Sequence, residues 1–205
     1  AFWGLACGPS TQSEAEQKVA TTADEIIGGT LAQGDPAVVA LAVRYGGVYE
    51  SLCTGTLIGP KTVLTAAHCI YAYGQNQSYY VTFGTYSSAP TKAVQVAQQY
   101  KHPAYGSNTY DFGLLRLAEP VLGVAPIPIN DTPMTQSMVG QPIRHVGFGL
   151  TVANSQNAGT KREVTYNLRQ VTTYTIESGA SGKQTCQGDS GGPGFMKLNG
   201  SAQES

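Results

Sequence analysis

A glycine-rich hexapeptide, residues 188–193 (GDSGGP), holds the residue with the clearest chemical potential, Ser190. A sharp turn of this kind lifts the serine hydroxyl clear of the backbone and points neighbouring N–H groups at the same spot. The hydroxyl is protonated at neutral pH and is a weak nucleophile until an adjacent base takes its proton. The sequence offers a base at His68, within TAAHC, and an orienting carboxylate at Asp111, within YDFGLL. These residue types together predict nucleophilic catalysis.

His68 is one of three histidines, and only its flanking residues point to catalysis; His102 and His145 are interpreted as surface or hydrogen-bonding residues. Imidazole, with a pKa near ~6.5, can accept a proton at neutral pH and return it afterwards. It therefore suits the roles of base toward Ser190 and acid toward a leaving amine. Asp111 would accept a hydrogen bond from the other ring nitrogen. The Phe-Gly pair after it is an unusual context, because glycine weakens a strand.

These motifs, in the order His, Asp, Ser, make the chain resemble the trypsin/chymotrypsin-like serine endopeptidases. Two further landmarks fit the same order: EIIGG at residues 25–29 and VGFG at residues 146–149. The resemblance implies hydrolysis of peptide bonds in proteins through an acyl-enzyme at Ser190. It also implies an oxyanion hole made by the backbone N–H groups of Gly188 and Ser190. The alternative is a catalytically silent, protease-like binding module.

The resemblance further implies a zymogen. Cleavage before Ile26 would free an ammonium group that pairs with the buried carboxylate of Asp189 and holds the oxyanion turn in place. A buried carboxylate without such a partner is unfavourable, so the uncleaved chain is expected to have a collapsed turn. Glu25 is an unusual residue before the cut, so the activating protease is unknown.

Gln184 stands where the resemblance places the floor of the substrate pocket. A neutral amide gives no ionic partner to Lys or Arg, so a weak preference for basic side chains is expected. The resemblance also pairs Cys53 with Cys69; the alternative is two buried thiols. Cys186 resembles a cysteine that bridges to one further downstream, and no cysteine follows it.

The composition limits the remaining function classes. The net charge is −1, and only 12% of the 205 residues are charged, so nothing favours binding to nucleic acid or an anionic membrane. No run of 18 apolar residues predicts a transmembrane span. Residues 51–110 contain no Asp or Glu to build a calcium loop, and no Cys/His cluster has zinc spacing. We expect no cofactor and no metal ion.

The elements that must position the site are short strands. Apolar or alternating runs rich in Val, Thr, Tyr and Ile recur throughout, and none keeps a helical period. They occupy residues 38–44, 51–58, 62–66, 79–83, 93–100, 114–117, 142–148, 163–176 and 194–198. This pattern predicts an all-β fold with one helical turn around residues 66–70. The resemblance implies two six-stranded antiparallel β-barrels, with the second incomplete at the C-terminus.

The expected peptidase domain covers residues 26–205. Its first barrel occupies about residues 26–120, a proline-rich connection about 119–133, and a truncated second barrel starts at about 134. Residues 1–25 are interpreted as an export-signal remnant plus a polar pro-segment or tether, with Cys7 as a candidate lipid anchor. The sequence is interpreted as truncated at both ends. We expect a secreted or cell-envelope bacterial protein, extracellular or periplasmic, acting as a monomer on protein substrates.

Overall fold

The computed structural model describes residues 29–72, 74–106, 109–151, 157–181 and 184–197. Within these ranges the fold is all-β, with two single 3₁₀ turns, η1 (Ala67–Cys69) and η2 (Gln136–Met138). The strands are β1 (Thr30–Leu31), β2 (Val38–Tyr45), β3 (Val48–Gly59), β4 (Thr62–Thr65), β5 (Tyr79–Phe83), β6 (Lys92–Lys101), β7 (Gly113–Leu117), β8 (Pro142–Gly147), β9 (Arg162–Val171), β10 (Ile176–Ser178) and β11 (Gly194–Phe195).

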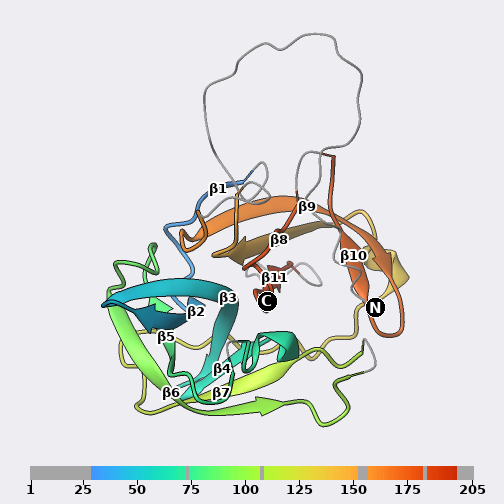
Figure 1. The fold of residues 1–205 in the computed structure, drawn as a ribbon. Coiled ribbons are helices and arrows are strands. Elements are labelled where there is room, and N and C mark those ends of the chain that lie inside the picture. The colour runs from blue at the N-terminus through green and yellow to red at the C-terminus, as the bar shows by residue number, and fades with distance from the viewer. Residues whose placement is uncertain (1–28, 73, 107–108, 152–156, 182–183, 198–205) are drawn as a thin grey trace, which may run out of the picture.

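The first half of the chain forms a closed, six-stranded antiparallel barrel. Its strands follow the order β2-β3-β4-β7-β6-β5, and β5 closes the barrel by pairing with β2. Figure 1 shows this barrel in blue to yellow-green, below the second sheet. Aliphatic side chains fill its interior, among them Leu57, Val63, Val81 and Leu115. The turn η1 lies where a helical turn was expected and follows directly on β4.

Strand β2 explains how the barrel meets the rest of the molecule. Its first six residues (VVALAV) are all buried, although successive side chains of a strand point to opposite faces. Val39 and Leu41 point into the barrel, whereas Val38 and Ala40 pack against a cluster that includes Phe148. A continuous apolar run thus marks a strand covered on both sides.

The second half, together with β1 from the start of the described chain, forms an open antiparallel sheet. Its order is β1-β9-β8-β11, and β10 pairs separately with β9. A smaller core packs on it, with Ile143, Tyr166, Leu168 and Met196 among its members. Residues 118–135 join the two halves without a strand or helix. One closed barrel beside one open sheet confirms the expected all-β class.

A partly buried ionic cluster fastens the second sheet to the entry of the first barrel. Arg144 of β8 donates to both carboxylate oxygens of Asp35, at 2.7 and 3.1 Å, and to Glu163 at 2.7 Å. Two-pronged guanidinium–carboxylate pairing of this kind is directional as well as strong. Beside it the Lys161 ammonium donates to the backbone oxygen of Asp35 at 2.9 Å. The relative placement of the two halves therefore rests on charge as well as on apolar packing.

Candidate active site

Antiparallel pairing of β4 with β7 brings His68 and Asp111 together. Thr65 at the end of β4 pairs with Gly113 at the start of β7, so the residues just beyond each strand meet at one rim. The Nδ1 atom of His68 lies 2.7 Å from Oδ2 of Asp111, and the backbone N–H of His68 donates to Oδ1 at 2.9 Å. A carboxylate can only accept, so Nδ1 carries the proton and Nε2 of the neutral ring is left as a base.

The unusual residues after Asp111 have structural explanations. A Cβ atom at Gly113 would stand 2.7 Å from the backbone oxygen of Tyr100, so only glycine fits at this start of β7. Phe112 remains 46% exposed and rests against the His102 ring, at 4.7 Å between centroids. His102 also stacks on Tyr110, which adopts a φ of 56°. The departure from the usual pattern thus leaves the Asp111 carboxylate in place.

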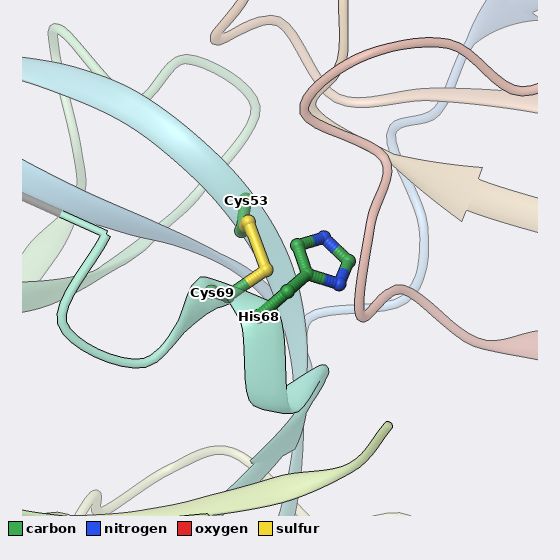
Figure 2. A group of neighbouring side chains, drawn as sticks. All are labelled: Cys53, His68 and Cys69. Atoms are coloured by element: carbon green, nitrogen blue, oxygen red, sulfur yellow. A yellow bond between two sulfur atoms is a disulfide. The ribbon is translucent and has the colours of Figure 1, made fainter. Parts of the chain in front are cut away.

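A disulfide fixes the turn that carries His68. Cys53 of β3 and Cys69 of η1 are bonded, with Cα atoms 6.2 Å apart, which confirms the expected pairing. Figure 2 shows the bond directly beside the imidazole. The two sulfur atoms and a His68 ring nitrogen lie within 4.8 Å of one another, but the bonded sulfur atoms are not thiolate ligands for a metal. Cys186 is disulfide-bonded as well.

The turn containing Ser190 lies against the same two elements. The backbone N–H of Thr54, next to Cys53, donates to the carbonyl of Ser190 at 2.9 Å, and the Cys69 sulfur is 3.7 Å from that oxygen. In Figure 2 the His68 ring points toward a loop in the red colour of the late chain. Gly191, with φ of +82°, permits this approach, because a Cβ there would be 2.6 Å from the backbone oxygen of Thr54.

The backbone at Gly188 has a defined orientation. Gly188 adopts a φ of +94°, and a Cβ there would be 2.9 Å from Cα of Gly149. The preceding carbonyl, of Gln187, accepts a hydrogen bond from the N–H of Leu150 at 2.7 Å. In a trans peptide the C=O and the next N–H point in opposite directions. The Gly188 N–H therefore points away from Leu150.

Asp189 is buried at the centre of the turn. Its carboxylate accepts hydrogen bonds at 2.8 Å from the N–H groups of Gly149 and Cys186. Burial raises the pKa of Asp189 to about 6, and those two hydrogen bonds partly offset the rise. The glycines on either side of Phe148 leave room for the Asp189 carboxyl group. A Cβ at Gly149 would stand 2.6 Å from the carboxyl carbon, and a Cβ at Gly147 would collide with a carboxyl oxygen. Ile26, its expected partner, lies outside the described residues.

Gln184 is half-buried in the segment before the turn. The next residue, Thr185, forms a hydrogen bond with the Tyr166 hydroxyl, and the Ser178 side chain forms another with the same hydroxyl. Burial raises the pKa of Tyr166, while both hydrogen bonds lower it. His145 stacks on Tyr166 at 4.9 Å, and its Nε2 lies 3.1 Å from the Ser178 hydroxyl.

Burial lowers the pKa of His145 to about 4, so this ring is neutral near neutral pH. Sequence reasoning did not find the cluster of His145, Tyr166, Ser178 and Thr185, because these residues come from three separate strands and a later loop and carry no local motif. It extends a polar network from the second sheet toward Gln184.

Comparison with known proteins agrees with this geometry. The sequence model of the family described as Trypsin matches residues 26–202. The chain belongs to the trypsin family. It is therefore related to serine proteases, which are hydrolases.

The similarity of this trypsin-family chain to individual members is moderate and extends over most of its length. It is 30% identical to chymotrypsin-like elastase family member 1 of Homo sapiens, over 94% of this chain and 82% of that protein. The Canis lupus familiaris protein of the same name is 29% identical, over 90% and 80%. The solved structure of neuropsin, a serine protease of mouse brain, superposes with a TM-score of 0.66 at 30% identity, covering 82% of this chain and 81% of that one. Among the described residues no helix is long and apolar enough to cross a membrane.

Proposed function

We propose that this trypsin-family protein is a serine endopeptidase that uses Ser190 as nucleophile, His68 as base and Asp111 as the group that orients the imidazole. The observation that carries the proposal is the 2.7 Å hydrogen bond between His68 Nδ1 and Asp111, beside the glycine-rich turn of Ser190. It leaves Nε2 as the proton acceptor.

In the proposed reaction the Ser190 oxygen attacks the carbonyl carbon of a peptide bond while its proton passes to Nε2 of His68. The carbonyl oxygen becomes an oxyanion, which the N–H groups of Gly188 and Ser190 stabilise. Donors of this kind are worth about 3 kcal/mol each in the transition state. His68 then gives its proton to the leaving amine, and an acyl-enzyme remains. Water then attacks the acyl carbon while His68 takes its proton, and His68 returns a proton to the Ser190 oxygen as the carboxylic acid product leaves.

Activation is proposed to follow cleavage between Glu25 and Ile26. The support comes from Asp189, which is buried and whose raised pKa shows that the carboxylate form is unfavourable in its present surroundings. An ammonium group beside it would stabilise the ionised form and lower that pKa. The new N-terminus would thus hold the turn from Gly188 to Ser190. The activating protease is to be identified.

Protein substrates follow from the trypsin family, and Gln184 bears on the side chain preferred at the cleavage site. With an amide as the proposed pocket floor, Lys and Arg gain no ion pair there. Peptides ending in Arg, Phe, Leu, Gln and Glu before the scissile bond, offered to the processed protein, test this. A dominant preference for Arg would overturn the assignment of Gln184.

We further propose a secreted or cell-envelope protein that works as a monomer. The Cys53–Cys69 disulfide supports an oxidising compartment. Mass spectrometry of the protein recovered from its native host tests the processing site. Peptide mapping without reduction also tests the lipid anchor expected at Cys7, which lies outside the described residues, because a sulfur that carries a lipid cannot be the partner of Cys186.

The decisive test of the function is hydrolysis of a peptide substrate by the full-length protein after cleavage at Glu25. We expect turnover in the wild type and its loss, by a factor of about 10⁶, in Ser190→Ala and in His68→Ala. A correctly cleaved, folded wild type that binds peptides without hydrolysing them would instead identify a binding module.

A further inference from the structure

Thr54 contacts the turn of the proposed nucleophile at two residues, although it lies on the first barrel and belongs to none of the sequence motifs. It is fully buried in β3, next to the disulfide-bonded Cys53. Its backbone N–H donates to the carbonyl of Ser190 at 2.9 Å. Its hydroxyl donates to the carbonyl of Gly188 at 2.8 Å. Thr54 therefore holds the turn at two residues, Gly188 and Ser190, which flank Asp189.

The same hydroxyl reaches a third segment. Thr54 Oγ1 accepts a hydrogen bond of 3.0 Å from the N–H of Phe148, the residue that follows β8 and lies between the two glycines facing Asp189. A threonine hydroxyl has one proton to donate and lone pairs to accept. Here the proton goes to Gly188 and a lone pair to Phe148. The hydroxyl thus joins the first barrel, the end of β8 and the nucleophile turn in one buried network.

We infer that Thr54 is a positioning residue that sets the orientation of the Gly188 and Ser190 N–H groups through its side-chain hydroxyl. The inference rests on the proposed function, since these two groups are the proposed oxyanion donors. The Gly188 carbonyl belongs to the peptide unit between Gly188 and Asp189. Fixing it limits rotation of the backbone between the two proposed donors. Together with the bond from Leu150 to Gln187, it clamps Gly188 from both sides.

The hydroxyl, rather than the bulk of the side chain, carries this role. Valine has nearly the shape of threonine but can neither donate to Gly188 nor accept from Phe148. The Phe148 N–H, which is buried, and the Gly188 carbonyl, which is partly buried, would then lose their partner, which is unfavourable unless the turn moves to find water. A shift of about 1 Å in a catalytic group can reduce the rate by about a hundredfold. The turn therefore gains its geometry from a bond that valine cannot replace.

The test compares Thr54→Val and Thr54→Ser with Thr82→Val in the full-length, processed protein. Thr82 is a suitable control because its hydroxyl is equally buried and has no hydrogen-bond partner among the described residues. For Thr54→Val we expect kcat to fall by about 10- to 100-fold, with KM changed by less than about threefold. Affinity for a peptide boronic acid, whose tetrahedral adduct occupies the oxyanion site, should fall in parallel.

Two further readouts separate positioning from general damage. The pH dependence of kcat/KM should keep its midpoint in Thr54→Val, because the His68–Asp111 pair is untouched. Thr54→Ser keeps the hydroxyl and should recover most of the lost kcat, while Thr82→Val should match the wild type. Wild-type kcat and analogue affinity in Thr54→Val would overturn the inference. So would a serine variant as impaired as the valine variant, since packing of the methyl group would then be responsible.

Amide hydrogen exchange distinguishes this inference from the proposed function. We expect the peptide covering residues 186–192 to exchange faster in Thr54→Val than in Thr82→Val, whether or not the protein hydrolyses peptides. A wild type without peptidase activity would refute the function while leaving this result to decide the role of Thr54. Equal exchange in the two variants would refute the role of Thr54 even in an active enzyme.

Discussion

The ionisation of Asp189 should govern the pH dependence of stability in the uncleaved chain. Burial raises the pKa of this carboxyl group from its ordinary value of 3.8 to about 6. A raised pKa means that the folded state binds the proton more tightly than the unfolded state does. The stability linked to that proton is complete below pH 4 and is lost as the pH rises through about 6. A pKa shift of one unit corresponds to about 1.4 kcal/mol, so the rise from 3.8 to about 6 corresponds to a full loss of roughly 3 kcal/mol in the free energy of unfolding.

Substituting Asp189→Asn removes this dependence. The amide oxygen can still accept one of the two backbone N–H bonds, from Gly149 or Cys186, and the loss of the other is a constant penalty at every pH. The relevant quantity is therefore the change with pH and not the absolute stability. Relative to wild type, the variant should gain roughly 2–3 kcal/mol in free energy of unfolding between pH 4 and pH 7.5.

Urea unfolding of the uncleaved protein at pH 4, 5, 6 and 7.5 measures this difference. Both proteins should carry Ser190→Ala, which prevents self-cleavage. Parallel pH profiles of the free energy of unfolding, for the protein that keeps Asp189 and for the Asp189→Asn variant, would refute the reasoning. Cleavage before Ile26 supplies a second check: if the new ammonium pairs with Asp189, the loss of wild-type stability between about pH 4 and pH 6 should disappear after cleavage.

Four other variants probe the site and its frame. Asp111→Asn should lower kcat by about 10⁴-fold in steady-state assays, because the imidazole loses the acceptor that fixes its tautomer; an unchanged kcat would exclude Asp111 from the reaction. Replacing both Cys53 and Cys69 by alanine opens a crosslink between residues 16 apart and should reduce the free energy of unfolding by about 3 kcal/mol in urea titration. Gly149→Ala puts a Cβ within 2.6 Å of a buried carboxyl carbon, whereas Gly34→Ala meets nothing within 4 Å. Thermal unfolding should show a loss of about 2–4 kcal/mol for the former and almost none for the latter; equal effects would contradict the packing described.

Local patterns predicted the strands well where turn-forming residues flank a strand at both ends. The run at residues 79–83 becomes β5 with the same bounds. The run at residues 163–176 instead divides into β9 and β10, because the Thr172 hydroxyl accepts bonds from the N–H groups of Tyr174 and Thr175 and closes a turn. Neither glycine nor proline marks that turn. A threonine-rich stretch with strong β-propensity therefore looked like one continuous strand.

Predicting the site depended on motifs rather than on periodicity. Short signatures around His68, Asp111 and Ser190 carried enough information to expect their roles, and the structure places His68 and Asp111 in direct contact. The support for the turn could not be foreseen in the same way. Thr54 bonds to groups 94 and 134 residues away, and its own neighbourhood reads as an ordinary strand. The bond from His145 to Ser178 likewise depends on the register between strands.

The measurement that tests the central claim most directly is covalent labelling with a fluorophosphonate, followed by mass-spectrometric mapping of the modified peptide. This reagent reacts with a serine whose proton is removed by a neighbouring base. For the full-length protein cleaved before Ile26, we predict a single adduct on Ser190 and none in His68→Ala. An adduct formed equally well without His68, or no adduct on a correctly processed protein, would contradict the account.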